Sequence, residues 1–375
     1  MGTEDGPLIV GAGPTGLAAA LFLAHRGVRS RVIDRALEPS TTSKALAVNP
    51  RTLALLEPTG VSARVLAEGI AMIGASFCRD WKPIASFGFR HLPAGTRMVV
   101  LPQARIEALL TEALGEQGIW VERGIEFVSL TQTGQEVEAE LRHGEESTER
   151  TRHRLMLGAD GAHSATRHAI GASFDGSSFP EIWPLRDVRL KTDLDPRRAH
   201  ASFFRDGLVF MIHIRDDIWR VMGNATDLLE RLPSSCSVGD MLWESEFHIS
   251  HRIASTMAVG RVALAGDAAH IHSPLGARGM NLGIEDAFVY ADCAADALDG
   301  RLERIEEYGV LRRAVDAKAV RRIERFTRLA RGRPQALAML RNVLLPIASR
   351  FGPTQRAVER LVTGLDHEVC TREAR

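Results

Sequence analysis

A glycine-rich turn near the N-terminus places the strongest constraint on how this chain can fold. Residues 8–10 are apolar and predict a short buried strand, and residues 11–16 follow it with the pattern G-x-G-x-x-G. The apolar residues 17–24 predict a helix, and residues 31–33 predict a second strand that ends at Asp34. A strand, a glycine turn, a helix, a second strand and a terminal acid together indicate a βαβ unit that binds a nucleotide.

Each glycine of this turn has a separate task in such a unit. Gly11 allows the tight turn, Gly13 lets the backbone approach a pyrophosphate, and Gly16 lets the helix pack on the strand. Asp34 lies about twenty residues further on, where a carboxylate can accept a hydrogen bond from a ribose hydroxyl. The pattern therefore predicts a dinucleotide site at the start of the first helix.

A second glycine-rich segment lies in the last third of the chain. Residues 262–265 are apolar and predict a strand, which Gly266 and Asp267 follow directly. A glycine-rich loop then leads into an apolar stretch that predicts a helix over about residues 282–297. Such an arrangement offers backbone N–H groups to an anionic or electron-rich group at the helix N-terminus.

A third motif, at residues 157–167, makes the pattern specific. Its sequence, LGADGAHSATR, resembles the Gly-Ala-Asp-Gly segment of single-component flavoprotein monooxygenases, the aromatic hydroxylases typified by para-hydroxybenzoate hydroxylase. The three motifs occur in that family's order, and residues 43–52 and 101–110 resemble it as well. The resemblance extends over about residues 8–330 and is closest to hydroxylases of aromatic polyketides and related phenols.

The resemblance implies an α/β fold with a Rossmann-like FAD-binding domain, an inserted antiparallel-sheet substrate domain and a helical C-terminal region. The expected boundaries are 1–72, 98–175 and 257–300 for a discontinuous FAD-binding domain, 73–97 and 176–256 for the substrate-binding β-sheet domain, and 301–375 for the C-terminal helical region. Many larger relatives carry a further thioredoxin-like domain, and we expect this chain to lack it.

Local patterns support that organisation. Alternating apolar residues predict antiparallel strands at about residues 200–204, 208–214 and 218–222. From about residue 301 the chain is expected to be helical to near Gly352.

The resemblance also implies where FAD binds. The diphosphate would lie over Gly11, Gly13 and Gly16, and the adenosine ribose would meet Asp34 with Arg35 beside the adenine. The remaining cofactor-binding candidates are Lys44, Gln103, Asp160, Arg220, Asp267, Pro274, Gly276, Gly279, Met280 and Asn281.

Several of these residues have simpler interpretations. Asp160 and Asp267 can act only as turn or capping residues, and Arg220 can be an ordinary strand arginine. Pro274 either faces the reactive side of the flavin or only shapes the loop. His270 is interpreted as a packing or hydrogen-bonding residue rather than a base.

The sequence departs from the family at two places. Lys44 stands where relatives often have arginine, and lysine keeps the charge but loses the bidentate fork. Ala277 and Arg278 stand where a glycine–glutamine pair is common, although the neighbouring glycines remain.

The function implied by the resemblance is an FAD-dependent monooxygenase. It would use NAD(P)H as a transient co-substrate, and O2, to hydroxylate an aromatic phenolic or polyketide-like molecule through a flavin hydroperoxide. No catalytic side chain is assigned, because the cofactor carries the chemistry. Candidates for the substrate pocket are Phe210, Ile212 and Met222. Epoxidation, Baeyer–Villiger insertion or simple oxidation with the same cofactor are the alternatives, together with a flavin-binding protein that has no activity.

The composition of the chain excludes several other classes of protein. Lys plus Arg and Asp plus Glu both number 47, and the resulting zero net charge argues against a nucleic-acid-binding protein. The four cysteines form no C-x-x-C pair or metal-ligand spacing, so we expect a reducing cytoplasm and no metal. We expect no signal peptide, and the apolar run in residues 17–23 is too short to span a membrane. The choice between NADH and NADPH and the oligomeric state are left open.

Overall fold

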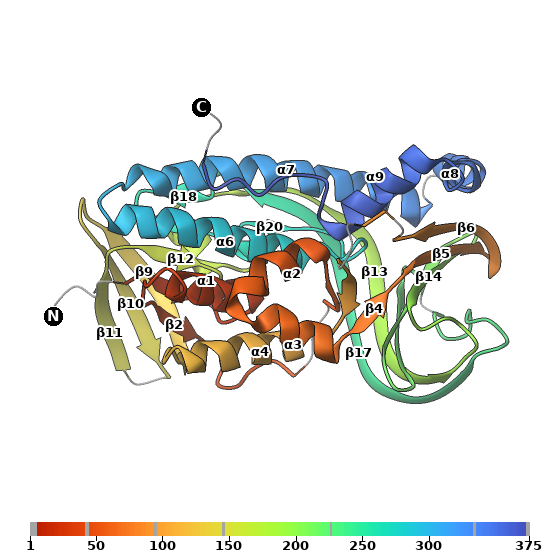
Figure 1. Ribbon diagram of the computed structural model, residues 1–375, viewed down its shortest axis with the longest axis horizontal. Coiled ribbons are helices and arrows are strands. Elements are labelled where there is room, and N and C mark those ends of the chain that lie inside the picture. Colours follow the sequence, from red (N-terminus) through yellow and green to blue (C-terminus); the bar gives the residue numbers. More distant parts are fainter. Residues whose placement is uncertain are drawn as a thin grey trace.

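The computed structural model describes residues 6–41, 45–89, 91–92, 96–144, 147–225, 227–332 and 335–372. Figure 1 shows a half built from helices and small sheets, joined by long strands to a half dominated by one larger sheet. The helices are α1 (Pro14–Ala24), α2 (Pro50–Leu56), α3 (Val61–Glu68), α4 (Gln103–Glu116), α5 (Ala165–Ala169), α6 (Gly279–Leu298), α7 (Glu303–Arg331), α8 (Gln335–Ala348) and α9 (Gly352–Thr363), with short 3-10 turns η1 (Glu57–Thr59) and η2 (Gly266–Ala268).

A six-stranded sheet forms the centre of the helical half. Its order is β18 (Ala258–Val259), β19 (Val262–Leu264), β12 (Met156–Gly158), β1 (Leu8–Val10), β2 (Arg31–Asp34) and β8 (Val121–Arg123). All neighbours are parallel except β18, which pairs antiparallel with β19. The three motifs predicted from the sequence therefore follow three adjacent strands, β1, β12 and β19, at one edge of the sheet.

Both faces of the six-stranded sheet are covered. Ile9 and Val32 pack with α1, α4 and α6 on one face. Leu8, Val10 and Ile33 pack on the other face against a small antiparallel sheet, β11 (Ser147–His153), β10 (Val137–His143) and β9 (Ile125–Gln132). This alternation follows from the period of two in a strand, and it explains why these strands are apolar on both sides.

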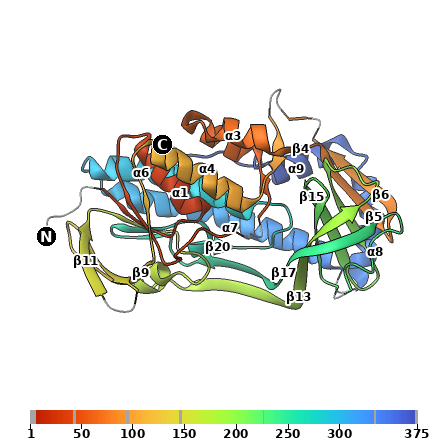
Figure 2. The same cartoon turned by 90° about the horizontal axis from the view of Figure 1, so that it is seen from below.

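An eight-stranded sheet forms the other half. Its order is β20 (His270–Ile271), β17 (Ser237–Ala254), β13 (Phe174–Lys191), β16 (Ile218–Gly223), β15 (Leu208–Arg215), β14 (Arg198–Phe203), β5 (Gly74–Arg79) and β6 (Lys82–Gly88). The strands β13 and β17 have 18 residues each and extend from one half into the other (Figure 2). A small sheet of β3 (Ala47–Val48), β7 (Met98–Val100) and β4 (Ile70–Met72) packs against Ile212 and Ile214 of β15.

The fold class is confirmed, as are the strands predicted near residues 200–222, which are β14, β15 and β16. The sheet is not wholly antiparallel, because β14 and β5 pair in parallel. β5 arrives from a distant segment of chain, so no hairpin turn fixes its direction. The prediction that helix ends near Gly352 is wrong, because α9 begins there. The domain boundaries stay a prediction.

Candidate functional site

A cavity of about 1090 Å³ lies between the two halves of the molecule. One wall is formed by residues that follow β1 and β12 and by the loop that leads into α6. The opposite wall is formed by strands of the eight-stranded sheet and by α7 and α8. Ligands in open α/β sheets bind outside the carboxyl ends of parallel strands, which is where this cavity lies.

The glycine turn after β1 has the geometry that its sequence predicts. Gly11 has a φ of +105°, and a Cβ there would lie 2.3 Å from the carbonyl oxygen of Ala159. A Cβ on Gly16 would lie 1.9 Å from the carbonyl oxygen of Gly11. A Cβ on Gly13 would meet no atom within 4 Å, and Gly13 lines the cavity at the start of α1. Two of the glycines are therefore needed by the fold, whereas Gly13 leaves open space in front of a helix N-terminus.

Two predicted acids use their side chains to hold neighbouring backbone. Asp34 accepts hydrogen bonds from the backbone N–H of Ala12 at 2.7 Å and of Ala36 at 2.8 Å. Asp160 accepts from Ser164 Oγ at 2.6 Å and from the backbone N–H of Thr166 at 3.0 Å, which fixes the start of α5. Neither Asp34, Arg35 nor Asp160 is among the residues that line the cavity. Their contacts with a cofactor stay predictions.

The segment from η2 through the first turn of α6 forms much of the cavity wall. The predicted residues of this region that line it are Asp267, Pro274, Gly276, Gly279, Met280 and Asn281. Asn281 is fully buried and donates to the carbonyl oxygens of Ala47 at 2.9 Å and Ala277 at 2.7 Å. Its side-chain oxygen accepts from the backbone N–H of Asn49 at 2.9 Å. Asn281 thus ties the loop and the start of α6 to the segment before α2.

Two of the three residues that depart from the family pattern, Ala277 and Arg278, have distinct effects. Ala277 adopts a φ of +53°, a left-handed conformation that costs roughly 1 kcal/mol for a residue other than glycine. Arg278 is buried and donates to the carbonyl oxygen of Leu361 and, at 2.8 Å, to Asp366. Arg278 therefore binds the loop to α9 and to the segment that follows α9.

Comparison with known proteins shows what this arrangement is. A family model described as an FAD binding domain matches residues 7–213 and 223–323. The chain is 34% identical over 390 residues to 6-methylpretetramide 4-monooxygenase of Streptomyces rimosus, covering 97% of this chain and 68% of that protein. The chain belongs to the FAD-dependent aromatic monooxygenases.

Further relatives agree with that assignment. Pentachlorophenol 4-monooxygenase of Sphingobium chlorophenolicum is 30% identical over 303 residues, covering 75% of this chain and 56% of that enzyme. The structure of OxyS anhydrotetracycline hydroxylase from Streptomyces rimosus superimposes with a TM-score of 0.83 at 27% identity, covering 96% of this chain and 76% of that one. The p-nitrophenol 4-monooxygenase PnpA of Pseudomonas putida DLL-E4 shares the fold, with a TM-score of 0.85 at 24% identity over 97% of this chain and 99% of that one.

The residues present fit the FAD of such a monooxygenase. Gly13 and Gly276 line the cavity, and at each position a Cβ would meet nothing within 4 Å. The N-termini of α1 and α6 both border the cavity, and their partial positive charges suit a diphosphate and an electron-rich ring. Ligand cavities are commonly about 300–1,000 Å³, so this one has room for a large cofactor and part of a substrate.

The other predicted residues take different positions. Gln103 lines the cavity at the start of α4 and donates to Glu107 at 2.7 Å. Arg220 lines it too, but its guanidinium pairs with Asp187 at 2.7 and 2.8 Å. Lys44 lies outside the described residues. A contact of Gln103 or Arg220 with FAD stays a prediction.

The opposite wall is largely aromatic and aliphatic. Phe210, Ile212 and Met222, predicted as pocket residues, all line the cavity from β15 and β16. Aromatic rings from three other strands, Phe77, Phe203 and Phe247, complete this wall. The wall therefore suits a flat, apolar molecule.

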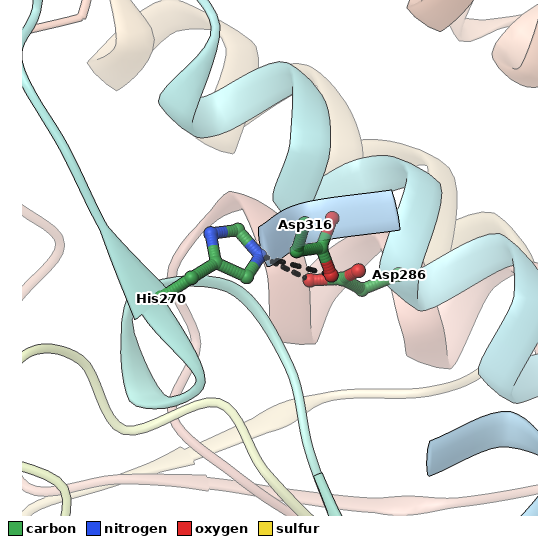
Figure 3. Close-up of side chains that lie close together, drawn as sticks. All are labelled: His270, Asp286 and Asp316. Atoms are coloured by element: carbon green, nitrogen blue, oxygen red, sulfur yellow. Dashed lines mark hydrogen bonds and ion pairs between the residues drawn. The ribbon is translucent and has the colours of Figure 1, made fainter. Parts of the chain in front are cut away.

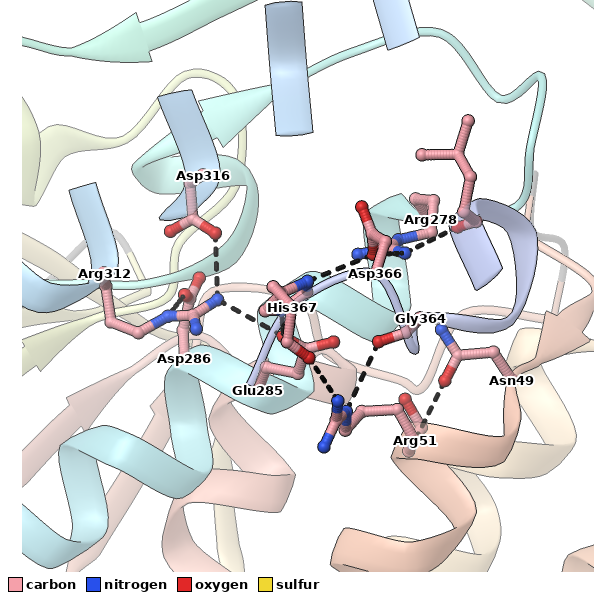
Figure 4. A network of polar contacts seen from close by, with 12 residues as sticks. Asn49, Arg51, Arg278, Glu285, Asp286, Arg312, Asp316, Gly364, Asp366 and His367 are labelled. Atoms are coloured by element: carbon pink, nitrogen blue, oxygen red, sulfur yellow. Dashed lines mark hydrogen bonds and ion pairs between the residues drawn. The ribbon is translucent and has the colours of Figure 1, made fainter. Parts of the chain in front are cut away.

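A buried polar network lies behind the cavity, between α6 and α7. His270 Nε2 is 2.7 Å from Asp286 and 3.7 Å from Asp316, and all three side chains are inaccessible to solvent (Figure 3). Arg312 donates to Asp286 at 2.6 Å and to Asp316 at 2.8 Å (Figure 4). His270 is thus a hydrogen-bonding residue, as interpreted from the sequence. The three acceptor groups lie close enough to hold a metal ion, but Arg312 already supplies the compensating charge.

The protonation of this network follows from burial and charge. Burial alone would lower the pKa of His270, but Asp316 and Asp286 outweigh it and raise that pKa to about 9. Burial raises the pKa of Asp286, but Arg312 and His270 bring it well below its usual range. Burial raises the pKa of Asp316 to about 7, against the opposing effect of Arg312. His270 is therefore a buried cation at neutral pH.

The network extends to the C-terminal segment. His367 Nε2 lies 2.6 Å from Glu285 on α6, and Arg51 on α2 donates to the carbonyl oxygens of Gly364 and His367 (Figure 4). These contacts fasten residues 364–367 against the helices that border the cavity.

Sequence reasoning missed some residues of the cavity. Arg167 is buried and donates at 3.0 Å to the carbonyl oxygens of Ala268 and Ala162, which joins the second and third motifs. Arg341 and Leu345 reach the cavity from α8. The one signal for Arg341 is a lone cation in the apolar stretch of residues 336–348.

Proposed function

We propose that this chain hydroxylates an aromatic small molecule, phenolic or polyketide-like, with FAD as cofactor and with NAD(P)H and O2 as co-substrates. One observation carries the proposal: glycine turns suited to a dinucleotide and an apolar, aromatic sheet face line the same cavity. The named relatives act on 6-methylpretetramide and pentachlorophenol, as their names state. The chain spans 68% and 56% of their lengths, so activity and substrate remain part of this proposal.

The residues divide the work between holding the cofactor and holding the substrate. Gly13 and the start of α1 would face the diphosphate, and the loop from Pro274 to Asn281 would border the ring. When bound, FAD supplies hydride acceptance from NAD(P)H and oxygen transfer to the substrate. The aromatic wall would orient the substrate ring, and its apolar surface would exclude water from the place where oxygen is transferred.

The mechanism that we propose requires little acid–base catalysis by side chains. The N-terminus of α6 would favour negative charge at the adjoining part of the ring, by roughly 0.3–1 kcal/mol where exposed and more where buried. Pro274, which lines the cavity, would limit access to one face of that ring.

A cytoplasmic location accords with four cysteines that are all unpaired. Among the described residues, no helix has the length and apolar character that crossing a bilayer requires.

Stopped-flow reduction tests the proposal directly. The FAD-loaded protein is mixed with NADH or NADPH in the presence of a panel of phenols and polycyclic quinones, and flavin absorbance is followed. We expect one compound class to accelerate reduction strongly and to yield a product one oxygen atom heavier. The carbon skeleton of the product separates hydroxylation from epoxidation and Baeyer–Villiger insertion. A protein that binds FAD but is not reduced with any compound would contradict the proposal and favour a non-catalytic flavin protein.

A further inference from the structure

A buried arginine without a carboxylate partner lies in the wall of the cavity. Arg341, on α8, is 3% exposed and is among the residues that line the cavity. Its Nη1 donates to the carbonyl oxygen of Ala330 at 2.8 Å, and its Nε donates to Asn342 at 3.1 Å. Within the described part of the chain, its Nη2 makes no hydrogen bond and no acid forms an ion pair with it.

The surroundings of Arg341 make this charge costly. Its guanidinium carbon lies 3.7 Å from the centre of the Phe203 ring, within a cluster that includes Ala330 and Leu345. Burial lowers the pKa of Arg341 to about 10, so the side chain remains a cation at neutral pH. Contact with an aromatic face recovers part of the desolvation cost, but an isolated buried charge is unfavourable unless an anion or strong acceptor completes it.

Two other arginines at the cavity have carboxylate partners, whereas the buried Arg167, like Arg341, donates to backbone carbonyl oxygens. Arg220 pairs with Asp187, and Arg278 pairs with Asp366. In each pair an acid of the protein supplies the charge opposite to the guanidinium. Arg341 differs from Arg220 and Arg278 because no acid of the described residues compensates its charge, and it differs from Arg167 because the terminal nitrogens of Arg167 both donate to backbone carbonyls.

The helix C-terminus explains only part of this placement. Arg341 donates to the carbonyl oxygens of Leu329 and Ala330 in the last turn of α7, and this is a common role for a cation. Both bonds use Nη1 alone. A capping role therefore accounts for one edge of the guanidinium and leaves Nη2 available to a ligand in the cavity.

We propose that Arg341 is a specificity-determining residue that binds an anionic oxygen of the aromatic substrate. This inference rests on the proposed function and adds a substrate class to it. The fitting chemistry is a flat, apolar ring system with a carboxylate, phenolate or enolate oxygen, because a guanidinium is a strong donor to such oxygens. The aromatic wall would hold the rings, and Arg341 would fix which end of the molecule lies away from the glycine turns.

A matched pair of probes tests the proposal on the FAD-loaded, full-length protein. The probes are 6-hydroxy-2-naphthoate and its methyl ester, which differ in one negative charge. Dissociation constants come from the change in flavin absorbance, which reports binding beside the cofactor and not on the outer surface. We expect the wild type to bind the acid more tightly than the ester.

The variants Arg341→Met and Arg341→Lys are compared with Arg328→Met, a surface substitution on α7 whose side chain is 58% exposed. Loss of a charged hydrogen bond should weaken binding of the acid by roughly 10- to 100-fold in Arg341→Met and change binding of the ester little. Arg341→Lys should retain part of the preference, and Arg328→Met should retain all of it.

The outcomes separate this inference from the proposed function. Equal binding of acid and ester by the wild type, or an unchanged preference in Arg341→Met, would overturn the role of Arg341. So would a wild type whose flavin absorbance responds to neither probe. Substrate-stimulated NAD(P)H oxidation could still be observed in each case, so the proposed function would stand. If Arg341→Met does not fold, Arg341→Lys decides, because an unaltered preference with a displaced charge would also contradict the proposal.

Discussion

Two regions of this protein bury arginine side chains in opposite ways. Between α6 and α7, Arg312 has Asp286 and Asp316 as partners, at 2.6 and 2.8 Å. At the cavity wall on α8, Arg341 has backbone carbonyls and an aromatic face, but no carboxylate of the described chain. In the first region acids of the protein balance the guanidinium, and in the second no acid of the described residues does. The difference separates groups that hold the fold from groups available to bind.

The same contrast holds for glycines. A side chain on Gly11 or Gly16 would collide with backbone, whereas one on Gly13 would enter the cavity without touching protein. A position where the fold leaves room, next to a helix N-terminus, is a position where a ligand can come close. We therefore expect substitutions of groups that contact other protein groups to change stability, and substitutions of groups that face open space in the cavity to change ligand binding.

The largest effect is expected from Arg312→Met. Removal of one member of a buried ion-pair network leaves Asp286 and Asp316 buried without their main compensation. The free energy of unfolding should fall by about 3–5 kcal/mol, as measured by urea denaturation at constant FAD concentration. Arg321→Met, an exposed position on the same helix, should change it by less than about 0.5 kcal/mol. Equal effects of the two variants would show that the buried ion-pair network contributes no more to stability than an exposed arginine does.

His270 should make stability depend on pH. Its pKa is raised to about 9 in the folded protein, against about 6.5 when unfolded. The stabilisation is fully present below the unfolded value and is lost as pH rises through the folded value. The free energy of unfolding should therefore fall by about 2 kcal/mol from about pH 7 to about pH 8.5. His270→Gln, though less stable, should have a flatter profile in urea denaturation over that range, and an unchanged slope would contradict the assignment.

Much of the cofactor side could be predicted from the sequence, because its motifs are local. The glycine turn, the strand before it and the acid after it lie within residues 8–34, and short-range sterics fix their geometry. The three motifs also meet as expected, since they follow adjacent parallel strands. The side chains of Asp34 and Asp160 were less predictable, because both acids have backbone partners of their own.

The rest of the site depends on contacts between distant residues. Arg312 and Asp286 are 26 positions apart, and Arg278 and Asp366 are 88 positions apart. Helical spacing indicates the pair Arg312 and Asp316, which are four positions apart, but it does not indicate these two longer-range pairs. The parallel pairing of β5 with β14 is equally nonlocal. Whether Arg341 would be paired or unpaired could be determined only once α7, α8 and the sheet were packed together.

Gly13→Ala should weaken FAD binding and leave the fold intact. Gly13 has a φ of −75°, which alanine adopts readily, and the added methyl group would meet no protein atom. It would instead occupy the space in front of α1, so FAD affinity should fall about tenfold or more, equivalent to at least about 1.4 kcal/mol. Titration of the apoprotein with FAD measures this. Gly134→Ala is the matched control, because a Cβ there also meets nothing and Gly134 does not line the cavity.

Arg341→Met should change stability much less than Arg312→Met, and the contrast between these two variants tests the comparison itself. Methionine keeps the apolar stem of arginine and removes a buried charge that no carboxylate of the described residues balances, which favours the folded state. The same change removes the hydrogen bond to Ala330 and the contact with Phe203, which disfavours it. These terms oppose each other, so the free energy of unfolding should change by less than about 1 kcal/mol. Urea denaturation of both methionine variants in parallel measures the difference. A decrease of several kcal/mol in the free energy of unfolding of Arg341→Met would show that Arg341 stabilises the fold. A residue whose main role is to bind a ligand should contribute little to the stability of the protein.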